Sequence, residues 1–139
     1  MVRSLCNNEI GAQIRFYYKL HPSEEHLYDY YVREFDNLPN VEVIPGSNMI
    51  MELLSKVSFI LTIQSTVEFE ALTMGVKVMI YKRLDFDNID SLFEEDGVYL
   101  MNNENDLLTV YQNFKNLRVH NYGYYFFRGL DSIVVDSII

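Results

Sequence analysis

Short apolar runs alternate along this chain with longer segments in which apolar residues recur every three or four positions. The runs at residues 14–20, 41–44, 59–63, 78–81 and 97–101 are rich in β-branched and aromatic residues, and they have the length of strands. Three intervening segments have apolar residues at helical spacing: Leu27, Tyr31 and Phe35; Ile50, Leu53, Leu54 and Val57; and Leu107, Leu108, Tyr111 and Phe114. The pattern therefore predicts strands that alternate with helices.

This alternation predicts an α/β fold with a Rossmann-like parallel sheet, right-handed crossovers and helices on both faces. A chain of 139 residues has the length of one domain, and we expect a single domain over 1–139, with a lead-in at 1–13 and a closing tail and helix at 117–139. Ligands of such sheets bind at the carboxyl ends of the strands. His21 follows the first strand and Ser65 the third, so we expect both at one edge of the sheet.

The segment after the third strand has the composition of an anion site. Ser65 or Thr66 is expected to cap a helix that Gly75 ends, and the next strand follows at once. Unpaired N–H groups at a helix start favour a negative charge, and a nucleotide phosphate is the ligand that this arrangement suggests. A helix needs one N-cap with or without a ligand, but two adjacent hydroxyls exceed that need.

Two motifs in this order resemble a family of enzymes. Ser65-Thr66, followed by Glu70-Ala71 and Gly75, resembles the C-terminal domain of GT-B glycosyltransferases. The upstream Lys19-Leu20-His21-Pro22 adds a resemblance to bacterial sialyltransferases, polysialyltransferases and the capsule and teichoic-acid polymerases. The resemblance implies one GT-B half-domain that binds a CMP-, CDP- or UDP-linked sugar donor for capsule, lipopolysaccharide or teichoic-acid synthesis, without a metal or another cofactor.

The resemblance also assigns residues. His21 is implied as the catalytic residue, because in these families the histidine and the hydroxyl pair contact the donor nucleotide. The implied nucleotide-binding residues are His21, Pro22, Gln64, Ser65, Thr66 and Glu70. The alternative for His21 is a ring that bonds a backbone carbonyl at the strand end. We interpret Glu68 as mainly solvated, and a solvated strand lysine is the favoured interpretation of Lys19.

One feature of the family is missing from the sequence. These enzymes also use an acidic base in an N-terminal acceptor-binding domain, and no such domain precedes Met1. We therefore expect that domain as a partner, and no activity from this chain alone. A sugar-nucleotide 2-epimerase-like domain and a non-catalytic interaction module on the same scaffold are the alternative interpretations.

The charge and composition of the chain argue against several classes of partner and site. The net charge of -9 argues against binding to a nucleic acid. No apolar run approaches the roughly 18 residues of a membrane helix, so we expect no transmembrane segment. A single cysteine, Cys6, fits a reducing compartment, and we expect a cytoplasmic chain or one peripheral at the inner membrane face. The acidic run 85–90 lacks the glycine and the ligand spacing of an EF-hand, and no metal site is expected.

The C-terminal tail concentrates aromatic residues between 122 and 127, ahead of a segment with helical apolar spacing. These side chains are either core or part of a lost interdomain surface. In the second case a homodimer is the expected consequence.

Overall fold

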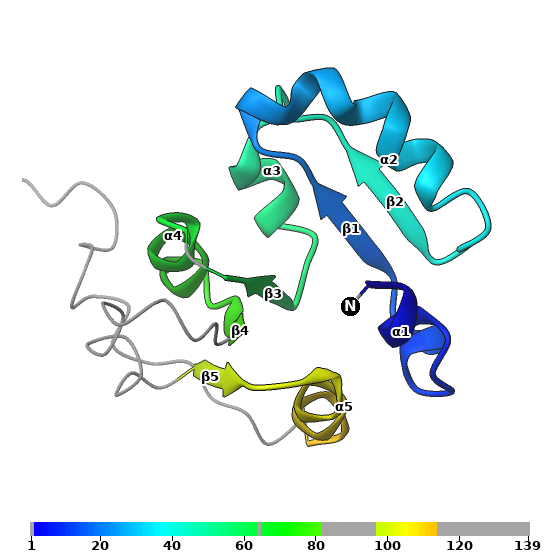
Figure 1. Ribbon diagram of the computed structural model, residues 1–139. Coiled ribbons are helices and arrows are strands. Elements are labelled where there is room, and N and C mark those ends of the chain that lie inside the picture. Colours follow the sequence, from blue (N-terminus) through cyan, green and yellow to red (C-terminus); the bar gives the residue numbers. More distant parts are fainter. Residues whose placement is uncertain (1, 64, 82–96, 114–139) are drawn as a thin grey trace, which may run out of the picture. The chain divides into compact units, whose positions relative to one another are not determined.

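The computed structural model describes residues 2–63, 65–81 and 97–113 (Figure 1). The chain divides into two compact units, Met1–Met49 and Ile50–Ile139, and each is described by itself. Among the described helices, none is long and apolar enough to cross a membrane.

The first unit is built on a pair of parallel strands. Its elements are α1 (Val2–Cys6), η1 (Gly11–Gln13), β1 (Phe16–Lys19), η2 (Pro22–Leu27), α2 (Tyr28–Glu34) and β2 (Val41–Ile44), where η marks a 3-10 helix. Phe16 lies opposite Val41 and Lys19 opposite Ile44. The core residues are Cys6, Phe35 and Leu38, with Phe16, Tyr18, Tyr31, Val41 and Val43 packed against them.

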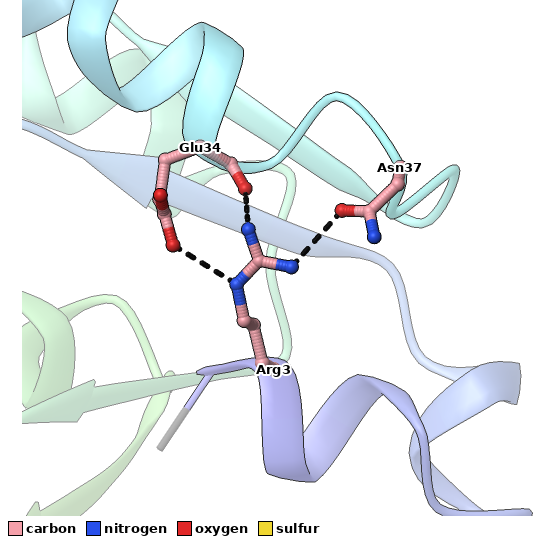
Figure 2. A network of polar contacts seen from close by, with 3 residues as sticks. All are labelled: Arg3, Glu34 and Asn37. Carbon is pink, nitrogen blue, oxygen red and sulfur yellow. Dashed lines mark hydrogen bonds and ion pairs between the residues drawn. The ribbon is translucent and has the colours of Figure 1, made fainter.

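The N-terminal segment is attached to the end of α2 (Figure 2). The Arg3 guanidinium donates to a carboxylate oxygen of Glu34 at 2.9 Å, to Oδ1 of Asn37 at 3.1 Å and to the backbone carbonyl of Glu34. Glu34 is the last residue of α2, so Arg3 satisfies a terminal carbonyl and places a positive charge at the negative end of the helix. The segment 1–13, predicted as a lead-in, therefore contains two short helices and is anchored to the first unit.

The second unit contains a three-stranded parallel sheet. Its elements are α3 (Ile50–Leu54), β3 (Phe59–Thr62), α4 (Val67–Thr73), β4 (Lys77–Tyr81), β5 (Val98–Met101) and α5 (Glu104–Gln112), with strand order β3-β4-β5. Val78 and Ile80 face a core shared with α3 and α4. Met79 alternates to the other face and is fully buried, and there Phe59 meets Tyr111 of α5 edge to face. Both faces of this sheet are covered, which explains why its strands read as apolar runs.

The α/β fold with parallel strands is confirmed, and all five strands lie within two residues of their expected positions. One detail differs from expectation: the described strands form two sheets, β1-β2 and β3-β4-β5. The expectation of one domain over the whole chain stays a prediction.

Candidate functional site

His21 follows β1 after one residue and caps η2. Its Nδ1 accepts a hydrogen bond from the backbone N–H of Ser23 at 3.2 Å and lies 2.7 Å from the Ser23 hydroxyl. In return, the Glu24 carboxylate accepts from the backbone N–H of His21 at 3.2 Å. This reciprocal pair is a capping box, and Pro22 occupies the first position of the helix, where its missing N–H costs nothing.

The cap determines which edge of the imidazole is available. A ring nitrogen that accepts from an N–H carries no proton, so the neutral His21 ring holds its proton on Nε2. The side chain is exposed, and Nε2 makes no hydrogen bond with a described residue. His21 thus bonds a backbone N–H and not the backbone carbonyl of the alternative interpretation, and its remaining donor can serve a phosphate or ribose oxygen.

Lys19 is not the solvated lysine that we expected from the sequence. Its Nζ donates to the carbonyl oxygens of Leu20 and Gly46, each at 2.8 Å, in a half-buried position. Burial lowers the pKa of Lys19, and the nearby charge of Glu25 acts in the opposite direction. The interpretation was wrong because the carbonyl of Gly46, 27 residues away in the sequence, supplies a partner that strand periodicity does not reveal.

The loop after β2 lies directly against the His21 turn. A Cβ added to Gly46 would lie 2.6 Å from the carbonyl oxygen of His21 and 2.9 Å from the Cα of Pro22. The Glu25 carboxylate also accepts from the backbone N–H of Ser47 at 3.0 Å. Because only glycine permits this approach, Gly46 is part of the construction that holds the carboxyl ends of β1 and β2 together.

Ser65 and Thr66 have different roles at the start of α4. The Ser65 hydroxyl accepts from the backbone N–H of Val67 at 3.3 Å. Thr66 immediately precedes the helix, but its side chain makes no capping hydrogen bond and is exposed. Of the two expected capping hydroxyls, that of Ser65 is committed to the turn and that of Thr66 is available.

Glu68 is buried, not solvated as we interpreted it from the sequence. It is 2% exposed, and its Oε1 accepts from the backbone N–H of Ser65 at 3.0 Å. Burial raises the pKa of Glu68, while hydrogen bonds from Ser65 and the Thr62 side chain act in the opposite direction. The signal was present in the sequence, because a serine three residues before a glutamate is a capping-box pattern. The Glu68 carboxylate therefore accepts a hydrogen bond from one of the N–H groups that we had expected to bind a phosphate.

Glu70 remains the available carboxylate of α4. The residue is half-buried, and its side chain makes no hydrogen bond or ion pair with a described residue. An acceptor of this kind suits the hydroxyls of a ribose. Gln64 lies outside the described residues, as do the acidic run 85–90 and the aromatic tail from 121 to 139.

The predicted residues fall into separate parts of the chain. His21 and Pro22 belong to the unit that ends at Met49, and Ser65, Thr66 and Glu70 to the unit that begins at Ile50. Each unit is described by itself, so the shared sheet edge stays a prediction. Within the described ranges, no three His, Cys, Asp or Glu side chains form a group that could hold a metal ion.

Comparison with known proteins adds no relative: no family model matches the chain, and no curated protein or solved structure matches it either.

Proposed function

We propose that this chain binds the nucleotide of a sugar donor as the C-terminal half of a metal-independent GT-B glycosyltransferase for bacterial surface polysaccharide. The observation that carries the proposal is the hydrogen bonding of the His21 ring. Its ring is fixed after a parallel strand by a capping bond at Nδ1, and Nε2–H is left as an exposed donor. A donor at the carboxyl end of a strand has the placement that α/β proteins use for ligands.

The available groups divide the work of binding. In the first unit, Nε2–H of His21 is the proposed donor to a phosphate oxygen. In the second unit, the hydroxyl of Thr66 is a proposed donor to a phosphate oxygen, and the Glu70 carboxylate is the proposed acceptor from ribose hydroxyls. Ser65 and Glu68 stabilise the turn that carries Thr66. The seven-residue α4 is not assigned an anion site of its own, because Glu68 already takes the Ser65 N–H.

By the resemblance, the proposed donor groups supply one part of catalysis. Donors on the phosphate stabilise the charge that develops as the nucleotide departs, which is the contribution assigned to His21 and Thr66. The base that activates the acceptor hydroxyl comes, by the resemblance, from an N-terminal domain. In this proposal the described residues bind the donor nucleotide.

The test is calorimetric titration of the chain with CMP, CDP, UMP and UDP. His21→Ala and Thr66→Ala should each make the binding free energy of the tightest-binding nucleotide less favourable by on the order of 1.5–3 kcal/mol, the value of a hydrogen bond to a charged group. His26→Ala and Thr109→Ala are matched controls, because both side chains are exposed and neither belongs to the proposed site. Wild-type protein that binds none of the four nucleotides would contradict the proposal and favour the non-catalytic interaction module.

A further inference from the structure

The carboxyl ends of β1 and β2 are joined by one ammonium group. Lys19 is the last residue of β1, and its Nζ donates at 2.8 Å to the carbonyl oxygens of both Leu20 and Gly46. Leu20 is the residue immediately before His21, and Gly46 lies against the carbonyl of His21. Lys19 therefore contacts the chain on both sides of the His21 backbone without touching the imidazole.

We infer that Lys19 is a positioning residue for His21, which fixes the direction in which the chain leaves β1 and so presents Nε2–H to the ligand. The inference rests on the proposed function for the identity of that ligand. The effect of Lys19 on the His21 imidazole can be measured in the unliganded chain, without any nucleotide.

The hydrogen bonds of Lys19 favour a role in positioning His21 over the role of a solvated surface charge. A strand lysine with no local task extends its ammonium into water, whereas this one turns inward to two backbone carbonyls in a half-buried place. Hydrogen bonds from a charged donor are about twice as strong as those between neutral groups, so the bridge holds the two strand ends firmly. Burial that lowers the pKa of Lys19 is consistent with an ammonium withdrawn from solvent.

The rest of the turn leaves little other freedom to His21. Ser23 fixes the ring through Nδ1, and Glu24 binds the backbone N–H of His21. Both of these partners lie within η2 itself, so they fix the ring relative to η2 but not relative to the strands. The bridge from Lys19 to Gly46 contributes to that second relation, together with the hydrogen bond from the Ser47 N–H to the Glu25 carboxylate.

The experiment replaces Lys19 by methionine, which keeps the length of the side chain and removes its donors. The ring nitrogen and carbon resonances of His21 are assigned by comparison with His21→Ala and recorded without ligand. Lys19→Met should shift these resonances and weaken CMP binding about threefold to tenfold, with circular dichroism unchanged. Lys56→Met, in the exposed turn after α3, is the control and should change neither. If Lys19→Met does not fold, Lys19→Gln is measured in its place.

A double-mutant comparison separates positioning from a general effect on structure. In a His21→Ala background, Lys19→Met should not weaken CMP binding further, because its effect acts through the missing ring. An equal loss in both backgrounds, or His21 resonances that do not move in Lys19→Met, would overturn the inference. If wild-type protein fails to bind nucleotide, the proposed function fails, and the ring resonances alone then decide the role of Lys19.

Discussion

Replacing Glu68 by glutamine should make the stability of the protein less dependent on pH. Glu68 is 2% exposed, and burial raises its pKa in the folded protein above the ordinary glutamate value. Between those two pKa values the native state binds more protons than the unfolded state, so the contribution of Glu68 to the free energy of unfolding falls as pH rises. Glutamine is isosteric and does not ionise, so the variant escapes this loss.

The magnitude follows from the hydrogen bonds that each substitution keeps. Glu68→Gln retains an oxygen that can accept from the Ser65 N–H, now 3.0 Å from Oε1, and should lie within about 1 kcal/mol of wild type at pH 7. Glu68→Ala removes that acceptor and leaves a half-buried N–H without it, which should cost about 1–3 kcal/mol relative to Glu68→Gln at every pH, because neither variant ionises at this position. The two variants thus separate the effect of charge from the effect of the capping bond.

The assay is urea denaturation followed by circular dichroism at several pH values between 4 and 8. Relative to wild type, Glu68→Gln should become more stable as pH rises above the ordinary glutamate pKa, and the difference should level off above the raised pKa of Glu68. Glu52→Gln is the control: Glu52 is exposed, and its hydrogen bond with Lys56 lowers its pKa. The stability of wild type relative to this variant should therefore rise only as pH approaches the ordinary glutamate pKa, and the two profiles should run parallel above it. Parallel pH profiles for wild type and Glu68→Gln would refute the reasoning.

Three further predictions test the packing. Gly46→Ala should cost about 1–3 kcal/mol in the free energy of unfolding by urea titration, because its Cβ would meet the backbone of His21 and Pro22. Gly75→Ala should cost about 1–2 kcal/mol for a different reason, since φ is +75° but no atom obstructs the Cβ; an unchanged midpoint would contradict this. Burial, followed by its hydrogen bond with Tyr31, raises the pKa of Tyr18, so spectrophotometric titration should show one tyrosine that ionises last and is missing in Tyr18→Phe. Stability should accordingly fall as pH rises above about 10, and by less in that variant.

Local signals were sufficient for the five strands, whereas the short helices α1 and η1 were not predicted. Strand β2 coincides with the expected run 41–44, because Pro45 and Gly46 interrupt it directly. The positive φ of Gly75 supports its expected role in ending α4. The division of strands between two sheets could not be predicted in the same way, because pairing depends on contacts between segments far apart in the sequence, whereas periodicity describes each segment alone.

The sequence predicted the positions of some residues of the candidate site but not the roles of others. His21 and Ser65 were identified from their positions after strands, but the roles of Glu68 and Lys19 were misjudged for different reasons. The spacing from Ser65 to Glu68 is a local pattern that indicates a capping box, so burial of this carboxylate could have been predicted. The bridge from Lys19 to Gly46 spans 27 residues and depends on how two loops pack, which no local pattern encodes.

Both proposed ligand-binding motifs also cap helices, so only some of their polar atoms are available to a ligand. A cap consumes one polar atom of each motif: Nδ1 in His21 and the hydroxyl oxygen in Ser65. What remains for a ligand is Nε2–H of His21 and the hydroxyl of Thr66, both on exposed residues. Substitutions should therefore divide into two classes. Ser65→Ala should lower stability by about 0.5–2 kcal/mol, as loss of an N-cap does, with little change in nucleotide affinity. Thr66→Ala should lower affinity with little change in stability, and the reverse result would show that the turn is structural only.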